Sequence, residues 1–386
     1  MRDAVICAAV RTPVGKRGGG LSGVHAVDLS ATVLDALVER TGIDPAVVDD
    51  VFWGCVSQVG EQTFNIARNA VLAAGWPESV PGATIDRQCG SSQQAVAFAA
   101  ATVISGQADV VVAGGVESMS RVPMGAARAD GLAGKPLGPR FLERYGGVFP
   151  NQGIGAEMIA ERWGFSRTQL DEYSLASHER AAKAQADGAF DEEIVPVTTP
   201  DGTVVRADEG IRPGGTLEKL ATLKTPFKED GVISAGNASQ ISDGSAALLV
   251  TTSEKARELG LRPLVRIHTT VMAGDDPVIM LTAPIPATHK VLQRSGLSVD
   301  DIGVFEVNEA FAPVPLAWQV ETGADADRLN SRGGAIALGH PLGGSGARIM
   351  TTLVHTMQAT GARYGLQTMC EGGGMANATV LELLTS

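Results

Sequence analysis

The sequence predicts an α/β fold in which helices cover buried sheets. The first observation is alternation, because stretches of helical spacing separate apolar runs typical of buried strands, at 4–10, 109–115, 246–251 and 303–308. The second is composition: aromatic residues form only 4% of the chain and glycine is abundant, which suits helices packed closely on strands. The third is an internal repeat that predicts two similar halves.

Each expected element has its own local signal. The strand runs are unbroken and rich in Val, Ile, Leu and Ala, as strands buried on both faces are. Apolar residues recur at helical spacing in 28–40, 66–74, 92–105, 287–295 and 343–360. A further amphipathic helix is expected near 166–187, where Ser166 and Gln169 have the spacing of a capping box.

The repeat rests on two short pairs of segments. ERTGI at 39–43 and QRSGL at 293–297 are each followed by acidic residues and a strand run that begins Val-Phe. A second pair matches Ala113–Gly115 with Gly372–Gly374. Their shared order predicts a duplicated architecture interrupted by a Pro- and Gly-rich insertion. We expect a first half at 1–118 completed by about 244–260, an inserted loop domain at 119–243, and a second half at 261–386.

Composition excludes several classes of function. The formal net charge of −12 provides no basic field for nucleic acid. No run of about 18 apolar residues predicts a membrane-spanning helix, and the N-terminal segment is typical of a strand and turn, not of an export signal. The four cysteines form no Cys-x-x-Cys pair, so no metal site is expected. We therefore expect a cytoplasmic protein with reduced thiols.

Cys89 is the first candidate for chemistry. It lies in DRQCGSSQQA at 86–95, directly before an apolar helical face, where the helix dipole and free backbone amides favour a thiolate. The alternative is a small residue at a tight strand-to-helix junction, and this stretch alone does not decide between the two.

Three further candidates lie in the C-terminal third of the chain. His340 precedes a proline within GGAIALGHPLGGSGAR at 333–348, where glycines allow tight turns and close approach to a ligand. The alternative is a phosphate-type loop with an incidental histidine, although the spacing is not that of Walker A. Cys370 leads into three glycines whose amides can form an oxyanion hole or a simple turn. Asn308 ends a strand run and can hold a water or carbonyl, or cap a helix.

Taken together, in this order and spacing, these four segments resemble the signatures of the thiolase family, and the resemblance covers essentially the whole chain. It implies the thiolase fold: two duplicated βαβαβαββ halves stacked in five layers (αβαβα), with a loop domain inserted in the first half. It also implies a homodimer or homotetramer. The activity implied is that of an acyltransferase with no covalently bound cofactor, which uses coenzyme A as its co-substrate.

The resemblance also assigns roles. Cys89 attacks the thioester or 3-keto carbon and carries the acyl group, after His340 takes the thiol proton. Cys370 moves the proton at the acetyl-CoA α-carbon, so we expect local tuning to bring its pKa from about 8.5 towards working pH. Asn308 positions a water that, with His340, stabilises the enolate oxygen. The backbone N–H groups of Cys89 and Gly372 form a second oxyanion hole.

Substrate contacts are expected outside these signatures. By resemblance, Arg212 contacts CoA and Ser239 contacts its pantetheine arm. Asn151-Gln152-Gly153 stands where short-chain synthetic members have His-Met-Gly, so we expect a tail longer or bulkier than acetyl. The candidate pocket residues are Asn151, Gln152, Met280, Phe311 and Leu342.

The expected reaction is CoA-dependent cleavage of 3-ketoacyl-CoA to acetyl-CoA and a shortened acyl-CoA, as in β-oxidation. One alternative is short-chain acetoacetyl-CoA synthesis. Another is a ketoacyl-synthase-like condensing enzyme, but such enzymes usually pair the cysteine with two histidines, and Cys370 takes the second reactive position here. The presence of all four candidate residues argues against a non-catalytic acyl-CoA-binding relative.

Overall fold

The computed structural model describes residues 2–128 and 134–384. Its main sheet follows the strand order β10-β11-β12-β9-β1-β8-β5-β3-β4. The strands of this path are β1 (Val5–Arg11), β3 (Asp50–Gly54), β4 (Ala83–Ile85), β5 (Val110–Ser118), β8 (Ser242–Thr251), β9 (Val265–Gly274), β10 (Val304–Val307), β11 (Tyr364–Glu371) and β12 (Met375–Leu383). β2 (Gly15–Lys16) pairs with β8, and β6 (Val197–Thr198) pairs with β7 (Val204–Val205) in a separate two-stranded sheet.

The sheet consists of two half-sheets with the same topology. β1 and β9 join them through a short antiparallel pairing, Val5 with Arg266 and Ile6 with Val265. Outward from β1 the neighbours are β8, β5 and β3, and outward from β9 they are β12, β11 and β10. In each half the first two junctions are antiparallel and the third is parallel. The predicted duplication is therefore present in the strand order itself.

The first of the two repeated segments is structurally equivalent in the two halves. ERTGI ends α1 (Ala26–Thr41) and QRSGL ends α9 (Pro284–Ser295). Gly42 and Gly296 cap these helices with φ of 67° and 73°, a left-handed conformation that glycine adopts without strain. A short 3-10 turn and then β3 or β10 follow each cap.

The prediction that the second pair of segments is equivalent was wrong. Ala113–Gly115 lies inside β5, whereas Gly372–Gly374 forms the turn after β11. Gly115 pairs with the last residue of β3, while the residue that pairs with the last residue of β10 is Thr368. The two glycine runs serve different purposes, close packing in one half and a tight turn in the other, so composition alone paired them incorrectly.

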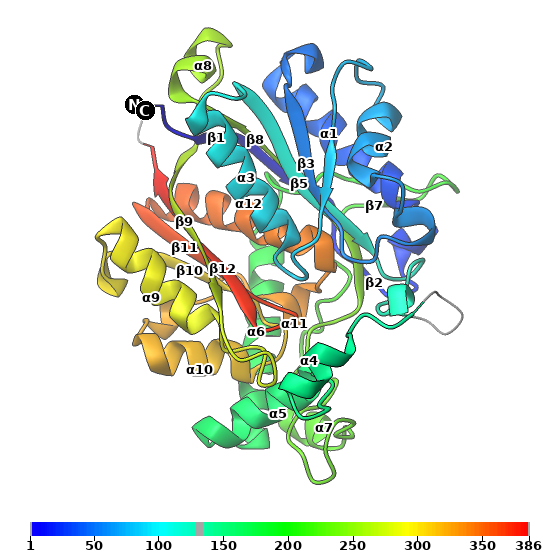
Figure 1. The fold of residues 1–386 in the computed structure, drawn as a ribbon, viewed down its shortest axis with the longest axis vertical. Helices are drawn as coiled ribbons and strands as arrows, with labels where there is room; N and C mark the ends of the chain where they lie inside the picture. The colour runs from blue at the N-terminus through cyan, green and yellow to red at the C-terminus, as the bar shows by residue number, and fades with distance from the viewer. Residues whose placement is uncertain (1, 129–133, 385–386) are drawn as a thin grey trace.

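Helices form three layers around the two half-sheets (Figure 1). The remaining helices are α2 (Ile66–Ala73), α3 (Ser91–Ser105), α4 (Pro139–Arg144), α5 (Gln152–Trp163), α6 (Arg167–Ala186), α7 (Leu217–Ala221), α8 (Ser253–Glu258), α10 (Pro313–Thr322), α11 (Ala335–Leu338) and α12 (Leu342–Thr360). α1 and α2 cover one outer face, and α9 and α10 cover the other. α3 and α12 pack against each other between the half-sheets, and α12 contacts strands of both. The five-layer αβαβα arrangement is confirmed.

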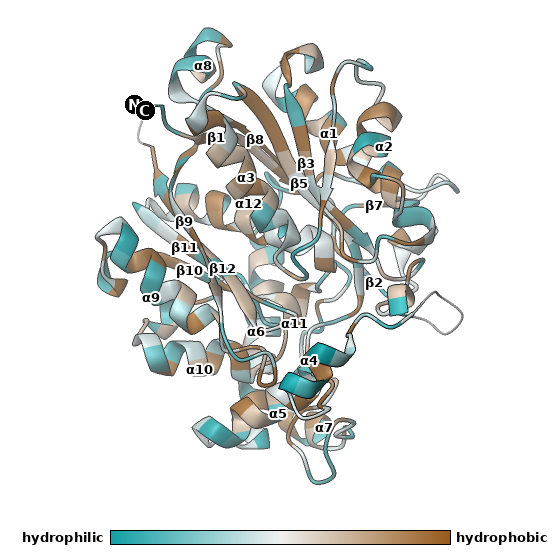
Figure 2. Ribbon diagram, in the orientation of Figure 1, coloured by the Kyte–Doolittle hydropathy of each residue, from teal (hydrophilic) through white to brown (hydrophobic). Residues whose placement is uncertain are grey.

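Packing follows hydropathy in this arrangement. Apolar runs fill much of β1, β5 and β8, while the outer helices carry both hydrophilic and hydrophobic residues (Figure 2). The central layer therefore has an apolar core shared by α3, α12 and both half-sheets. No helix in the described part of the chain has the length and apolar character needed to cross a bilayer.

The chain between β5 and β8 carries α4 to α7 and lies over one end of the sheets (Figure 1). α6 begins as predicted: Ser166 Oγ accepts from the N–H of Gln169, and the Gln169 side chain accepts from the N–H of Ser166. Side chains of α5 and α6 pack with Met280, Phe311 and Cys370 of the second half. This segment therefore covers the end of the sheets where the candidate residues lie.

Candidate active site

Four elements bring the candidate residues together. Cys89 precedes α3, Asn308 follows β10, His340 precedes α12, and Cys370 lies on β11. Nδ2 of Asn308 lies 3.4 Å from Nε2 of His340, and an Asn308 side-chain hydrogen bond acts on the Cys370 thiol. Cys370 is near enough to Cys89 for its charge to raise the pKa of the Cys89 thiol. All four residues are buried, with at most 4% of their surface exposed.

The loop before α3 holds Cys89 in a constrained position. Gln88 has φ of 49°, a left-handed conformation that costs a non-glycine residue on the order of 1–3 kcal/mol. Ser91 offsets this strain, since its Oγ donates to the Gln88 carbonyl at 2.6 Å and accepts from the N–H of Arg87 at 2.9 Å. Cys89 then packs against Leu342, Ile349 and Met369. The sequence prediction of a cysteine at the start of a buried helix is confirmed.

The two thiols differ from the prediction in their acidity. Burial raises the pKa of Cys89 well above its ordinary value, and the charges of Cys370 and Glu371 raise it further, although its own backbone amide and Gln152 oppose this. Burial likewise raises the pKa of Cys370 to about 12, against a hydrogen bond from Asn308. The helix terminus therefore does not make Cys89 acidic, and the expected tuning of Cys370 towards working pH is not found, because desolvation exceeds the opposing hydrogen bonds. Both groups are thiols at neutral pH.

His340 can accept a thiol proton through a defined ring nitrogen. Its Nδ1 lies 2.6 Å from Oγ of Ser345, and this hydroxyl donates to the Pro341 carbonyl at 2.9 Å. Because the Ser345 hydroxyl proton is donated to Pro341, the Ser345 oxygen accepts a hydrogen bond from Nδ1–H of His340. Nε2 therefore carries no proton and is the acceptor. Burial, and then the charge of Arg348, lower the pKa of His340 to about 3. His340 is a neutral imidazole whose Nε2 points towards Asn308.

Two further charged residues, Glu306 and Arg348, are buried near Asn308 and His340. Glu306 precedes Asn308 by two residues on the same face of β10, and Arg348 follows Ser345 by three residues on the same face of α12. Both are buried, and the three guanidinium nitrogens of Arg348 have no acceptor among the described residues. Burial raises the pKa of Glu306 to about 8, and Arg348 opposes that shift.

Asn308 is not a helix cap. The N-cap of α10 is Ala312, so the capping interpretation of Asn308 is excluded. Its N–H donates to the Thr368 carbonyl at 3.1 Å, which fixes it beside β11. Its Oδ1 is buried without a donor among the described residues, so it can accept a hydrogen bond from a bound molecule.

The neighbouring Glu309 joins the loop segment to the second half. Its carboxylate accepts from Tyr173 and Ser177 of α6 at 2.9 and 2.7 Å, from Asn330 at 3.1 Å, and from the N–H of Ile336 at 3.1 Å. Sequence reasoning gave Glu309 no role, although it stands in the Asn-Glu-Ala-Phe segment. Ser345 was likewise missed, and its only signal was its position five residues after His340.

The glycines around His340 pack helices together. A Cβ on Gly343 would lie 2.5 Å from the Val116 carbonyl oxygen, and one on Gly346 would lie 2.3 Å from the amide nitrogen of Gln93. These glycines therefore let α12 approach β5 and α3, and do not line a phosphate loop as the alternative interpretation had it. In contrast, Gly373 and Gly374 have φ of 89° and 75° and make the turn after Cys370.

The expected pocket residues surround this centre unequally. A side-chain hydrogen bond from Gln152 acts on the Cys89 thiol, and Leu342 packs against Cys89. Met280 and Phe311 share an apolar cluster with Cys370. Asn151 is exposed and its Oδ1 accepts from the N–H groups of Gly153 and Ile154, so it caps α5.

The expected CoA contacts and Gly372 lie around the same centre. Ser239 is half-buried and donates its N–H to the Ala310 carbonyl at 2.9 Å. Arg212 is exposed, with Nη2 3.3 Å from Oε1 of Gln240, whose carbonyl accepts from the N–H of His340. Gly372 begins the turn after β11 beside Gln88.

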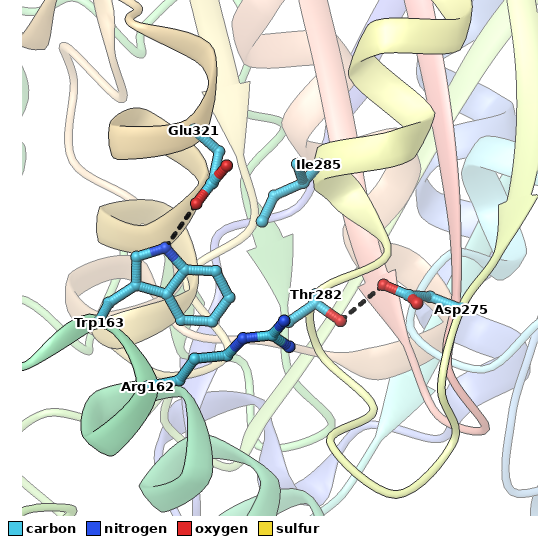
Figure 3. Close-up of a pocket in the computed structure, with 6 residues that line it drawn as sticks. All are labelled: Arg162, Trp163, Asp275, Thr282, Ile285 and Glu321. Carbon is cyan, nitrogen blue, oxygen red and sulfur yellow. Dashed lines mark hydrogen bonds between the residues drawn. The ribbon is translucent and has the colours of Figure 1, made fainter.

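A surface hollow of about 480 Å³ lies apart from the four candidate residues. The hollow is lined by Arg162 and Trp163 of α5, Ile285 of α9, Glu321 of α10, and by Asp275 and Thr282, which precede α9 (Figure 3). Its polar groups are mostly paired: Trp163 donates to Glu321 at 2.8 Å, and Thr282 donates to Asp275 at 2.7 Å. The chemistry is therefore assigned to the buried centre, not to this hollow.

Comparison with known proteins agrees with this geometry. The family model described as thiolase, N-terminal domain, matches residues 4–254, and that described as thiolase, C-terminal domain, matches residues 261–383. The chain belongs to the thiolase family. A steroid 3-ketoacyl-CoA thiolase of Mycobacterium tuberculosis is 51% identical, with 100% of this chain and 95% of that protein covered.

Two further relatives cover the whole thiolase chain. A beta-ketoadipyl-CoA thiolase of Escherichia coli is 45% identical and covers 99% of this chain and 100% of its own length. The crystal structure of the Bacillus anthracis acetyl-CoA acetyltransferase superposes with a TM-score of 0.91 at 41% identity, over 100% of this chain and 99% of that one. This thiolase is accordingly an acyltransferase, and the relatives differ in the acyl groups that their names specify.

Proposed function

We propose that this thiolase cleaves 3-ketoacyl-CoA with coenzyme A, giving acetyl-CoA and a shortened acyl-CoA through an acyl-Cys89 intermediate. One observation carries the proposal: Cys89, Asn308, His340 and Cys370 arrive from four different elements at one buried centre. A non-catalytic relative would have no need to desolvate two thiols and a neutral imidazole together. The names of two relatives, which specify 3-ketoacyl-CoA and beta-ketoadipyl-CoA, support the substrate class.

The proposed first half-reaction uses His340 as the base. Nε2 takes the Cys89 proton as sulfur attacks the 3-keto carbon, so the low acidity of the resting thiol is overcome only when the substrate is in place. The C2–C3 bond then breaks, and its electrons pass to the acetyl-CoA enolate. Asn308, through a bound water, and His340 stabilise the enolate oxygen. Cys370 gives its proton to C2, and acetyl-CoA leaves.

The second half-reaction transfers the acyl group to coenzyme A. Cys370 regains its proton from the incoming CoA thiol, and the CoA thiolate attacks the acyl-Cys89 carbonyl. The C–S bond to Cys89 then breaks, the Cys89 sulfur takes back the proton held by His340, and the shortened acyl-CoA leaves. The backbone N–H groups of Cys89 and Gly372 are proposed to bind the oxygen of the tetrahedral intermediate. Arg212 and Ser239 are proposed to contact CoA and its pantetheine arm. Each step moves only protons and an acyl group, so the chemistry calls on CoA as co-substrate and on no bound cofactor.

A homo-oligomer is proposed from one exposed face. β4 ends the strand path, so its outer edge has no neighbouring strand among the described residues. Large apolar side chains lie exposed near it: 86% of the Phe64 surface and 45% of the Phe98 surface are accessible. A dimer or tetramer that covers this face is expected, and light scattering on purified protein distinguishes the two. We also propose a cytoplasmic location and an inserted loop domain at 119–243.

The test of the reaction is a thiolysis assay with 3-ketoacyl-CoA and free coenzyme A. Wild-type protein should release acetyl-CoA and a shortened acyl-CoA in equal amounts, and Cys89→Ala should release neither above the uncatalysed rate. The similarity to the Bacillus anthracis acetyl-CoA acetyltransferase favours a second candidate, short-chain acetoacetyl-CoA synthesis. It would prevail if acetoacetyl-CoA were the best thiolysis substrate and longer tails were rejected.

A further inference from the structure

Glu371 lies directly beside the two thiols, and no step above uses it. It follows Cys370 on β11, so its side chain points to the opposite face of the strand. There its carboxyl presses against the loop of the nucleophile: a Cβ on Gly90 would lie 2.0 Å from Oε1 of Glu371. The residue has no exposed surface, and neither carboxyl oxygen has a hydrogen-bond partner among the described residues. Burying such a group is costly, so it calls for a function.

Few charged groups face this carboxyl. Burial raises the pKa of Glu371 to about 8, while Arg87, from the loop before α3, and the backbone of Asn377 on β12 oppose the shift. Arg87 is not hydrogen-bonded to Glu371, and its Nη1 lies 3.9 Å from the sulfur of Met375. The Glu371 carboxylate in turn affects the two thiols, since its charge raises the pKa of Cys89 and of Cys370.

We propose that Glu371 is a charge switch for the two thiols: as a neutral acid it permits thiolate formation at Cys89 and Cys370, and as a carboxylate it suppresses both. The switch consists of the loss of one proton from the carboxyl to solvent. Glu371 acts through the two cysteines, so it is a positioning residue. The switch sets an upper pH limit on acylation, because the carboxylate forms as the pH rises. The inference rests on the proposed role of Cys89 as nucleophile.

The first test follows the reactivity of Cys89 against pH. Iodoacetamide is added to the full-length protein between about pH 6 and 10, and peptide mass spectrometry reports the alkylation rate of Cys89 alone. Glu371→Gln should move the rising limb to lower pH and react at least about threefold faster near pH 9. Glu371→Asp, which keeps the charge, should restore the wild-type limb. Glu382→Gln, on the partner strand β12, is the matched control and should change nothing.

The second test does not depend on the role of Cys89. The folded-state pKa of Glu371, about 8, lies above its ordinary value of 4.5, so the native protein holds a proton that the unfolded chain has lost between these values. Wild-type stability should therefore decline as pH rises through this window. The Tm of Glu371→Gln minus that of wild type should widen from pH 5 to 8 and then stay constant, since the variant has no carboxyl to titrate.

Each outcome supports or overturns the switch. A shifted alkylation limb together with a widening Tm gap supports it. An unchanged limb in Glu371→Gln, or a Tm gap that is the same at every pH, would mean that the carboxyl only fills space. Failure of the proposed reaction is recognised separately, by the absence of acyl mass on the Cys89 peptide of wild-type protein.

Discussion

Nδ2 of Asn308 lies 3.4 Å from Nε2 of His340, although the two residues come from different elements, the end of β10 and the start of α12. Each residue is held by a hydrogen bond of its own: Nδ1 of His340 bonds to Ser345, and the N–H of Asn308 donates to the Thr368 carbonyl. Once Nε2 holds the proton taken from Cys89, the two groups can stabilise a negative charge that develops beside them without a change in their positions. This relationship supports the proposed enolate site.

The first prediction ranks these two residues. Loss of one oxyanion donor typically lowers kcat on the order of 10²–10³-fold, so Asn308→Ala should fall in that range. His340→Ala should cost more, because His340 also takes the Cys89 proton. Steady-state thiolysis on folded variants measures both. The opposite ranking would contradict the two roles proposed for His340.

A second prediction places the covalent intermediate. Brief incubation with acyl-CoA should add the acyl mass to the peptide that contains Cys89. Cys7 is buried on β1, and Cys7→Ala is the matched control that should keep full labelling. Acyl mass found only on peptides with Cys7 or Cys55 would exclude Cys89 as the nucleophile.

The third prediction separates the two thiols. Cys370→Ala should still accept an acyl group at Cys89, because the proposed task of Cys370 is proton transfer at carbon. The variant should lose exchange of the acetyl-CoA α-protons in deuterated water, measured by NMR. Full exchange in Cys370→Ala would remove Cys370 from the mechanism.

A fourth prediction concerns stability at low pH. The pKa of His340 in the folded protein, about 3, lies below its ordinary 6.5, so the unfolded chain binds a proton that the native protein refuses. Stability from this group is present above pH 6.5 and is lost as pH falls towards 3. The Tm of His340→Gln relative to wild type should therefore rise as the pH is lowered from 7 to 5. A constant difference would mean that His340 is not held neutral by burial.

Local sequence signals predicted most elements and the duplicated halves, because helix caps such as Gly42 and Gly296 and unbroken strand runs act within a few residues. They failed for Gly114 and Gly373, since a glycine required for packing and one required for a turn look alike in sequence. Positive φ is found only at the second of these.

The four signature residues could be predicted from sequence, but their acidity could not. The helix terminus at Cys89 is visible in the sequence, whereas its desolvation depends on Leu342, Ile349 and Met369, which lie far along the chain. Ser345 and Glu309 act through contacts that only the fold creates, with the His340 ring and with α6.

The last prediction concerns the acyl tail. Gln152 acts on the Cys89 thiol from the start of α5, at the position where short-chain synthetic members are expected to have methionine. If the pocket beside it admits a larger tail, each buried methylene contributes roughly 0.8 kcal/mol, about a fourfold gain in kcat/KM. Thiolysis efficiency should rise from acetoacetyl-CoA to longer or branched 3-ketoacyl-CoA. Gln152→Met should lower the ratio of long-tail to acetoacetyl-CoA efficiency, whereas Asn151→Ser, which keeps the cap of α5, should change it less. Because both variants lie in one turn, an equal effect of the two would point to the backbone of α5, and a wild-type preference for acetoacetyl-CoA would assign this thiolase to short-chain acetyl transfer.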